Sequence, residues 1–131
     1  MKGPLWMRRI TVAASGYLKR YGEPKTPEAL LEHQTIQFGS SASWRFVQDG
    51  RDIEVTPSPR FISNSADAAL QYAEAGGGVT RVLAYQAAEG LKRGRLKIVL
   101  ARYEQPALPI HIIYPTSRLL SAKVRAFVDL V

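Results

Sequence analysis

The chain of 131 residues contains no cysteine. Disulfides, a thiolate nucleophile and thiolate metal ligands are therefore excluded, and the composition is compatible with a reducing interior. Long apolar runs are also missing. The start carries Lys2, Arg8 and Arg9 without the apolar segment of a signal peptide, and no stretch approaches the length of a membrane span. We expect a single soluble domain in the cytoplasm, without a membrane partner.

Catalytic and phosphate-binding motifs are missing as well. The sequence has no G-x-S-x-G elbow, no G-x-x-x-x-G-K phosphate loop and no H-E-x-x-H. The glycines at 76–78 follow a helix-like run, whereas a dinucleotide fingerprint follows a strand and opens a helix. His33 and His111 stand far apart without ligand-like neighbours. We therefore predict no enzyme activity, no cofactor and no metal site.

Acidic residues are the minority charge. Eighteen lysines and arginines oppose 11 aspartates and glutamates, which gives a net charge of +7. Such a surplus can indicate a nucleic-acid partner. The basic residues are scattered in short clusters with no single basic helix, which favours a solvated surface, and a basic nucleic-acid-binding protein is the less favoured alternative.

Short strand-forming runs alternate with helical ones. Strands are expected at 9–14, 35–39, 43–47, 52–56, 60–63, 96–101 and 109–115, and helices at 15–22, 26–33, 66–75, 82–94 and 121–131. The Asp49-Gly50 pair predicts a hairpin, so the middle section is expected to be antiparallel in part. Ser15 and Thr26 are expected to cap helices, and Gly22 and Gly94 to end them. The alternation predicts an α/β layered fold.

The segment "SNSADAALQYAEAGGGV" begins with three polar residues where a strand should become a helix. Ser65 or Asn64 is expected to cap this helix. The free N–H groups and positive dipole at that point favour a carboxylate or similar anion, to which Ser63, Asn64 and Ser65 could add hydrogen bonds. The alternative is that these residues only satisfy the N–H groups of the helix.

Six segments, taken in order, resemble the latter part of the effector-binding domain of LysR-type transcriptional regulators. They cover about Ile10 to Val131: "VAASGYLKRYGEPKTPEALLEH", "SWRFVQDGRDIEV", "SNSADAALQYAEAGGGV", "LAYQAAEGLKRGRLKIVL", "PIHIIYP" and "SAKVRAFVDLV". The chain departs from the family pattern at Gly16, at Gly76–Gly78 and at 80–84, where a proline is common. These departures concern local loop shape.

The resemblance implies one lobe of a periplasmic-binding-protein-like (type II) domain, with a small-molecule effector held between two lobes joined by crossover strands. Residues of about 14–108 would form the second lobe, and about 109–131 a crossover strand and a terminal helix of the first. "RITVAA" and "PIHIIYP" would be the crossovers, with Ile10–Ala13 pairing antiparallel to Ile110–Ile113. Ser15 and Thr80, near other strand–helix junctions, are secondary effector-binding candidates.

The resemblance also implies a sensory function. Effector binding would favour one relation between the lobes and so shift the DNA-bound assembly of the regulator. DNA would be reached only through a helix-turn-helix domain, which the chain does not contain, so we expect a fragment of a longer regulator. An incomplete first lobe should expose apolar surface and promote a dimer or larger homo-oligomer. A free-standing small-molecule or partner-binding module is the alternative.

Overall fold

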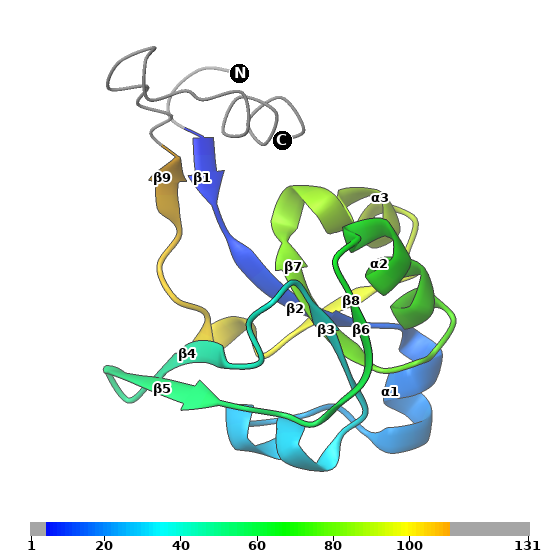
Figure 1. Cartoon of the computed structure of the whole chain (residues 1–131), viewed down its shortest axis with the longest axis horizontal. Coiled ribbons are helices and arrows are strands. Elements are labelled where there is room, and N and C mark those ends of the chain that lie inside the picture. Colours follow the sequence, from blue (N-terminus) through cyan, green and yellow to red (C-terminus); the bar gives the residue numbers. More distant parts are fainter. Residues whose placement is uncertain (1–4, 111–131) are drawn as a thin grey trace.

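The computed structural model describes residues 5–110, which form the elements shown in Figure 1. In chain order they are β1 (Leu5–Met7), β2 (Arg9–Ala13), α1 (Ser15–Tyr21), the 3-10 helix η1 (Pro27–Glu32), β3 (Thr35–Phe38), β4 (Trp44–Gln48), β5 (Arg51–Val55), β6 (Pro59–Ser63), α2 (Ala66–Glu74), β7 (Val79–Leu83), η2 (Ala84–Ala87), α3 (Ala88–Lys92), β8 (Lys97–Val99), η3 (Ala101–Tyr103) and β9 (Leu108–Ile110).

The centre of the fold is a five-stranded mixed sheet in the order β6-β3-β7-β2-β8. Strand β3 is parallel to β6 and β7, whereas β2 is antiparallel to both of its neighbours. The carboxyl ends of β3, β6 and β7 therefore lie at one edge of the sheet, together with the start of β2. The predicted α/β fold class is confirmed.

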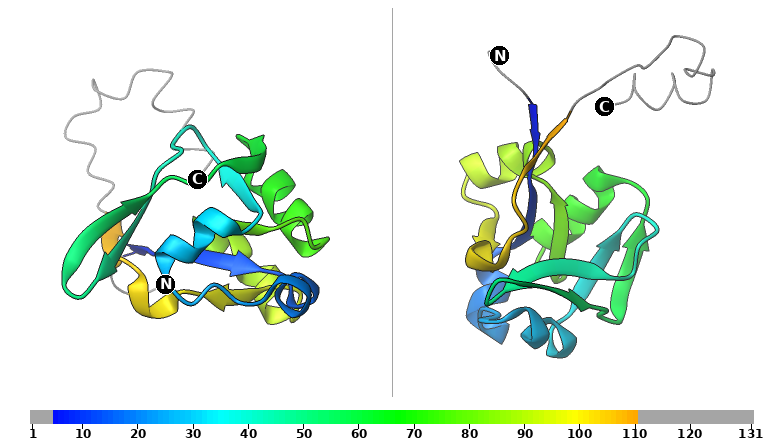
Figure 2. Two further views of the ribbon diagram at one scale, coloured as in Figure 1. Left: turned by 90° about the horizontal axis from the view of Figure 1, so that it is seen from below. Right: turned by 90° about the vertical axis from the view of Figure 1, so that its left-hand side faces the viewer.

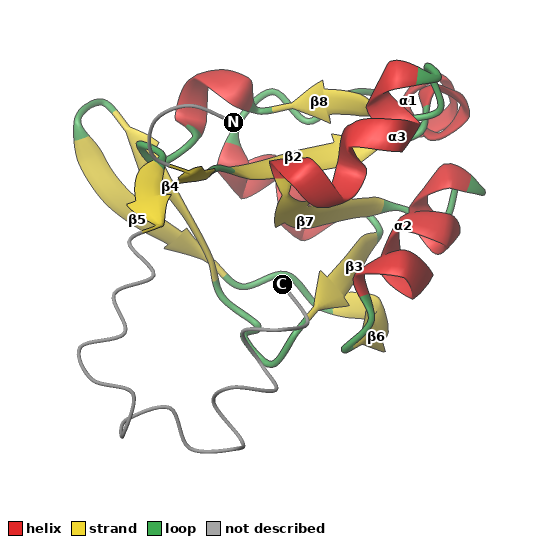
Figure 3. Cartoon of the chain, turned by 90° about the horizontal axis from the view of Figure 1, so that it is seen from above, coloured by secondary structure: helices red, strands yellow, loops and turns green. Residues whose placement is uncertain are grey.

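Both faces of the sheet are covered by apolar side chains. On one face α2 packs along β3, β6 and β7 (Figure 3), and its residues Ala69, Leu70 and Ala73 join a core cluster that includes Ile36 and Val82. The small alanines let this helix approach the sheet closely. The other cluster combines side chains from α1, η1 and the β4–β5 hairpin: Tyr17, Leu30, Trp44, Phe46 and Val55.

The β4–β5 hairpin confirms the Asp49-Gly50 turn. Gln48 pairs with Arg51 across a two-residue loop, and Asp49 and Gly50 both have positive φ, 53° and 75°. Positive φ at both central residues is the geometry of a type I′ turn, which matches the twist of the flanking strands.

Gly78 lets the chain pass from α2 into β7 beside β3. Its φ is 148°, and a Cβ at this position would lie 2.5 Å from the carbonyl oxygen of Gln34. The same oxygen accepts a hydrogen bond from Val79 N at 2.9 Å. A side chain at Gly78 would therefore push β7 away from the start of β3.

The expected pairing of Ile10–Ala13 with Ile110 is wrong. Strand β2 instead pairs with β7 and β8, and the antiparallel partner of Ile110 is Leu5. The physical reason is burial: four consecutive residues of β2, from Ile10 to Ala13, are inaccessible, which requires a central place in the sheet. The two-stranded ribbon of β1 and β9 extends away from that sheet (Figure 2).

Two local predictions also need correction. Ser15 is the first residue of α1, whose N-cap is Ala14 without a side-chain cap bond. The helix expected at 82–94 starts later, because Val82 belongs to β7 and pairs with Ile10. Residues 111–115 of the expected last strand and the terminal helix at 121–131 lie outside the described residues.

Candidate functional site

A pocket of about 480 Å³ opens where β3 and β7 end and β2 begins. Its volume is typical of sites for small organic ligands. It is hereafter called the arginine pocket, and its lining residues are Arg9, Phe38, Ser40, Ser41, Ser43, Trp44, Arg45, Arg81, Val82 and Leu83.

The chain path explains why these residues meet. Because β3 and β7 are parallel neighbours, their last residues, Phe38 and Leu83, reach the same edge of the sheet. Gly39, with a φ of 92°, then turns the chain into the serine-rich loop that leads to β4. Trp44 and Arg45 at the start of β4 complete the wall.

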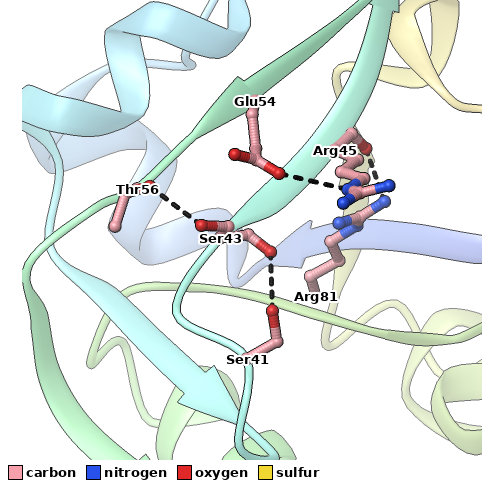
Figure 4. Close-up of polar contacts among 6 residues, drawn as sticks. All are labelled: Ser41, Ser43, Arg45, Glu54, Thr56 and Arg81. Atoms are coloured by element: carbon pink, nitrogen blue, oxygen red, sulfur yellow. Dashed lines mark hydrogen bonds and ion pairs between the residues drawn. The ribbon is translucent and has the colours of Figure 1, made fainter.

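Arg81 projects from β7 over the β4–β5 hairpin (Figure 4). Its Nη2 donates to the carbonyl oxygen of Arg45 at 2.5 Å, and its Cζ lies 5.0 Å from the centroid of the Phe46 ring. Burial, and to a smaller extent the nearby charge of Arg9, lower the pKa of Arg81 to about 10, although Glu104 acts in the opposite direction. The side chain is still charged at neutral pH and is held in place by the carbonyl and the ring.

The carboxylates of this region are already paired with other arginines. Glu104 binds Arg8 through two hydrogen bonds of 2.8 and 3.2 Å, and Glu54 binds Arg45 at 3.2 Å (Figure 4). Within residues 5–110, the ion pairs of the region do not include Arg9 or Arg81. The pocket therefore presents positive charge without a matching carboxylate from the described chain.

The serine loop is tied to the hairpin by its own hydrogen bonds. The Ser41 hydroxyl donates to the carbonyl oxygen of Ser43 at 3.0 Å, and the hydroxyls of Ser43 and Thr56 share a hydrogen bond of 3.0 Å (Figure 4). These contacts hold the loop in place at the mouth of the pocket.

The predicted polar residues before α2, Ser63–Ser65, are hereafter called the α2 entrance. Ser65 is the N-cap and accepts a hydrogen bond from Ala68 N at 3.2 Å, which confirms the predicted cap. The Ser63 hydroxyl accepts from Ser65 N at 3.0 Å and donates to the carbonyl oxygen of Ser65. Asn64 is exposed. The entrance adjoins the pocket loop through Gly39 N, which donates to the carbonyl oxygen of Ser63, but its three residues do not line the pocket.

The two secondary candidates lie elsewhere. Thr80 is fully buried, and its hydroxyl donates to the carbonyl oxygen of Ile36 at 3.0 Å. Ser15 follows the carboxyl end of β2, which is antiparallel to β7, and therefore lies at the opposite edge of the sheet. The structure does not bring Ser15 together with the α2 entrance. Effector contacts of all five predicted residues stay predictions.

Sequence reasoning missed Arg9 and Arg81. The available signal was the position of Arg81 inside "VTRVL", a strand whose other residues are mostly buried. A charged residue in such a strand needs a specific partner or task. The serines at 40, 41 and 43 gave no comparable signal, because serine is common in loops.

Other kinds of site find little support in the described part of the chain. No three histidine or acidic side chains among residues 5–110 come together to hold a metal ion. The helices of this part are all too short or too polar to cross a membrane.

Comparisons with known proteins relate the chain to transcription regulators. YcaN, an uncharacterized HTH-type transcriptional regulator of Escherichia coli K12, is 33% identical over 128 residues, which cover 94% of this chain and 41% of that protein. The HTH-type transcriptional activator AaeR of the same organism is 26% identical over 126 residues, with the same two coverages. The chain thus spans about two fifths of the length of these relatives.

Solved structures show the same fold. The LysR-type transcriptional regulator CrgA from Neisseria meningitidis superposes with a TM-score of 0.73 at 21% identity, over 98% of this chain and 45% of that one. The regulatory domain of AphB in Vibrio vulnificus superposes with a TM-score of 0.72 at 21% identity, over 97% of this chain and 65% of that one. The model of the LysR substrate binding domain matches residues 5–131. The chain therefore belongs to the LysR substrate-binding domain family, whose members are transcription regulators and not enzymes.

Proposed function

We propose that the chain is the effector-sensing part of a cytoplasmic LysR-type transcriptional regulator. A small molecule would bind between the described sheet and a second lobe, and would thereby control the assembly of the regulator on DNA. The observation that supports this most directly is the arginine pocket, which opens at the carboxyl ends of parallel strands, where α/β sheets bind ligands.

In this proposal the described sheet is the second lobe, and residues of about 109–131 supply a crossover strand and a terminal helix of the first. The antiparallel ribbon of β1 and β9 would be the crossover. The second lobe would then begin with β2 rather than after it, because β2 is a central strand of the sheet.

The α2 entrance would contribute secondary contacts. Asn64 is exposed, and the carbonyl oxygen of Ser63 accepts a hydrogen bond from Gly39 N at the start of the pocket loop. A carboxylate of the effector could also accept hydrogen bonds from the N–H groups near Ser65 and Ala66. Because both serine hydroxyls already have partners inside the chain, we rank the entrance below the arginine pocket.

A ligand screen on the 131-residue chain tests the sensing function. Small polar and anionic metabolites would be screened by thermal shift, and the backbone amide signals of bound forms mapped by NMR. We expect binders to shift the signals of residues 38–45 and 81–83. A screen in which every binder maps away from this region, or none binds, would contradict the proposal.

A DNA titration at several salt concentrations tests the alternative use of the +7 charge. We expect weak binding that falls with salt and shows no sequence preference. Tight sequence-selective binding by this chain would instead support a nucleic-acid-binding protein.

We also propose a homo-oligomer. Large apolar side chains are exposed on the described surface, including Leu31 at 61% and Ile62 at 60%. Exposed apolar surface of this kind promotes association. Light scattering should therefore give a mass above 14.5 kDa, and a monomer across micromolar concentrations would contradict this.

A further inference from the structure

Building on the proposed function, we infer that the arginine pocket recognises an organic carboxylate. Arg81 and Arg9 hold the carboxylate, and the apolar side chains of the same pocket cover the organic part of the ligand.

Arg81 has hydrogen-bonding capacity to spare. A guanidinium carries five N–H donors in a plane, and within the described chain one of its nitrogens is engaged, by the Arg45 carbonyl oxygen. The Phe46 ring lies beneath the guanidinium and helps to hold it in place. A planar guanidinium held in this way matches the two oxygens of a carboxylate.

Arg9 lies on the same face of the sheet. Arg81 is paired with Thr11 and Arg9 with Leu83, so the two arginines are diagonal neighbours on adjacent antiparallel strands. Diagonal neighbours lie roughly 7–8 Å apart, which long side chains span easily. An anion between them would be attracted by both charges and would offset their mutual repulsion.

The acidic groups beside the pocket balance this charge only in part, because Glu104 and Glu54 hold Arg8 and Arg45, although Glu104 also attracts Arg81. A partly buried charge without a partner is unfavourable. The pocket is therefore matched to a negatively charged ligand and poorly matched to a neutral one.

The remaining wall selects for an organic ligand. Phe38 and Leu83 are half-buried and line the pocket next to the arginines, whereas the lining residues Trp44 and Val82 are almost completely buried in the core. An inorganic anion would satisfy the charge and leave this apolar surface uncovered, whereas an organic carboxylate covers both.

Benzoate and benzamide form a suitable pair of probes, because they have similar shape and differ in charge. Each would be titrated into the 131-residue chain, with NMR signals of residues 38–45 and 81–83 followed to saturation. We expect benzoate to bind at least tenfold more tightly than benzamide. The variant Arg81→Gln loses one charged hydrogen-bonding partner of the ligand. Its affinity for benzoate should be roughly tenfold to hundredfold weaker.

Two further variants control for charge and folding. Arg51→Gln removes one positive charge at the exposed hairpin turn and should leave benzoate binding within about twofold, since exposed charges are screened. Arg81→Lys keeps the charge without the planar fork and should bind benzoate with intermediate affinity. Its affinity for benzoate still tests the role of Arg81 if Arg81→Gln does not fold.

Three results would overturn the inference. Equal binding of benzoate and benzamide in the pocket would do so while leaving the sensing function intact. If sulfate binds as tightly as benzoate, the pocket recognises an anion without selecting for an organic one. If benzoate shifts none of the pocket signals, the pocket does not recognise this carboxylate and the inference fails. The metabolite screen would then decide separately whether the chain senses a ligand.

Discussion

The α2 entrance and the arginine pocket lie at the same edge of the sheet, yet they use their polar groups differently. At the entrance, the hydroxyls of Ser63 and Ser65 are already bonded to the backbone of the chain itself. In the pocket, Arg81 is fixed by a carbonyl and an aromatic ring while its charge has no carboxylate partner in the described chain. The pocket therefore has more capacity to bind a ligand.

This difference also separates stability from recognition. A cap residue stabilises its own helix, so its removal should lower mainly the free energy of unfolding. A partly buried charge without a carboxylate partner does not stabilise the free chain, so its removal should weaken mainly the binding of a ligand. The following substitutions test this separation.

Phe46→Ala should have the largest effect. The ring is 1% exposed and packs in the core beneath Arg81, so its removal should lower the free energy of unfolding by about 3–5 kcal/mol. Urea denaturation measures this. Phe46→Leu is the matched control and should cost less while still removing the ring beneath Arg81. A loss below about 1 kcal/mol for Phe46→Ala would show that the ring beneath Arg81 contributes little to the core.

Ser65→Ala should lower the free energy of unfolding by about 0.5–2 kcal/mol, because Ala68 N loses its capping acceptor. Benzoate affinity should stay unchanged. Ser65→Asn restores a good cap and should recover most of the stability. If Ser65→Ala weakens benzoate as much as Arg81→Gln does, the two regions are not separate.

Ser63→Ala and Asn64→Ala should have smaller effects on binding than Arg81→Gln. A neutral hydrogen bond contributes about 0.5–1.5 kcal/mol, so a secondary contact should change affinity by roughly twofold to tenfold. Asn64→Ala is the cleaner of the two, because the Ser63 hydroxyl is also bonded to the backbone of the cap residue Ser65. Titration of each folded variant with benzoate gives the comparison. Unchanged affinity for both would assign the entrance to structure alone.

The smallest predicted effect is a pH dependence of folding that leaves the pocket untouched. Gln34 N donates to the Tyr17 hydroxyl, and the same hydroxyl shares a hydrogen bond of 2.8 Å with His33 Nδ1. Burial lowers the pKa of His33, opposed by Glu32. The unfolded chain therefore takes up this proton first, near pH 6.5, and stability should be complete above that pH and fall below it.

Unfolding measured from pH 5 to 8 checks this, with His33→Asn as the control that removes the titrating ring. Benzoate affinity should be flat over the same range, because Arg81 stays charged throughout. A benzoate affinity that follows the His33 titration would link the two ends of β3, contrary to the separation described above.

The sequence predicted most of the fold because its signals are local. The Asp49-Gly50 turn, the Ser65 cap and the Gly22 stop each depend on a few neighbouring residues, and the structure confirms all three. The place of β2 was mispredicted, because "RITVA" has the same strand-forming character in a crossover and in a sheet centre. Burial by the surrounding strands decides between them.

The site was harder to predict for a related reason. The α2 entrance consists of three residues that are adjacent in the sequence. The arginine pocket instead combines residues from β2, from β4, from β7 and from the loop that follows β3. Arg9 and Arg81 become neighbours only through the register of two antiparallel strands. No short pattern encodes that register, so the sequence indicated the correct edge of the sheet and not the residues that matter most there.

A crystal of the chain grown with 4-bromobenzoate tests the central claim most directly, because the bromine signal fixes the position and direction of the ligand. We predict the ligand in the arginine pocket, with its carboxylate about 2.7–2.9 Å from the guanidinium nitrogens of Arg81 and its ring against Phe38 and Trp44. A carboxylate bound instead to the backbone N–H groups at Ser65 and Ala66, with Arg81 uncontacted, would contradict the account.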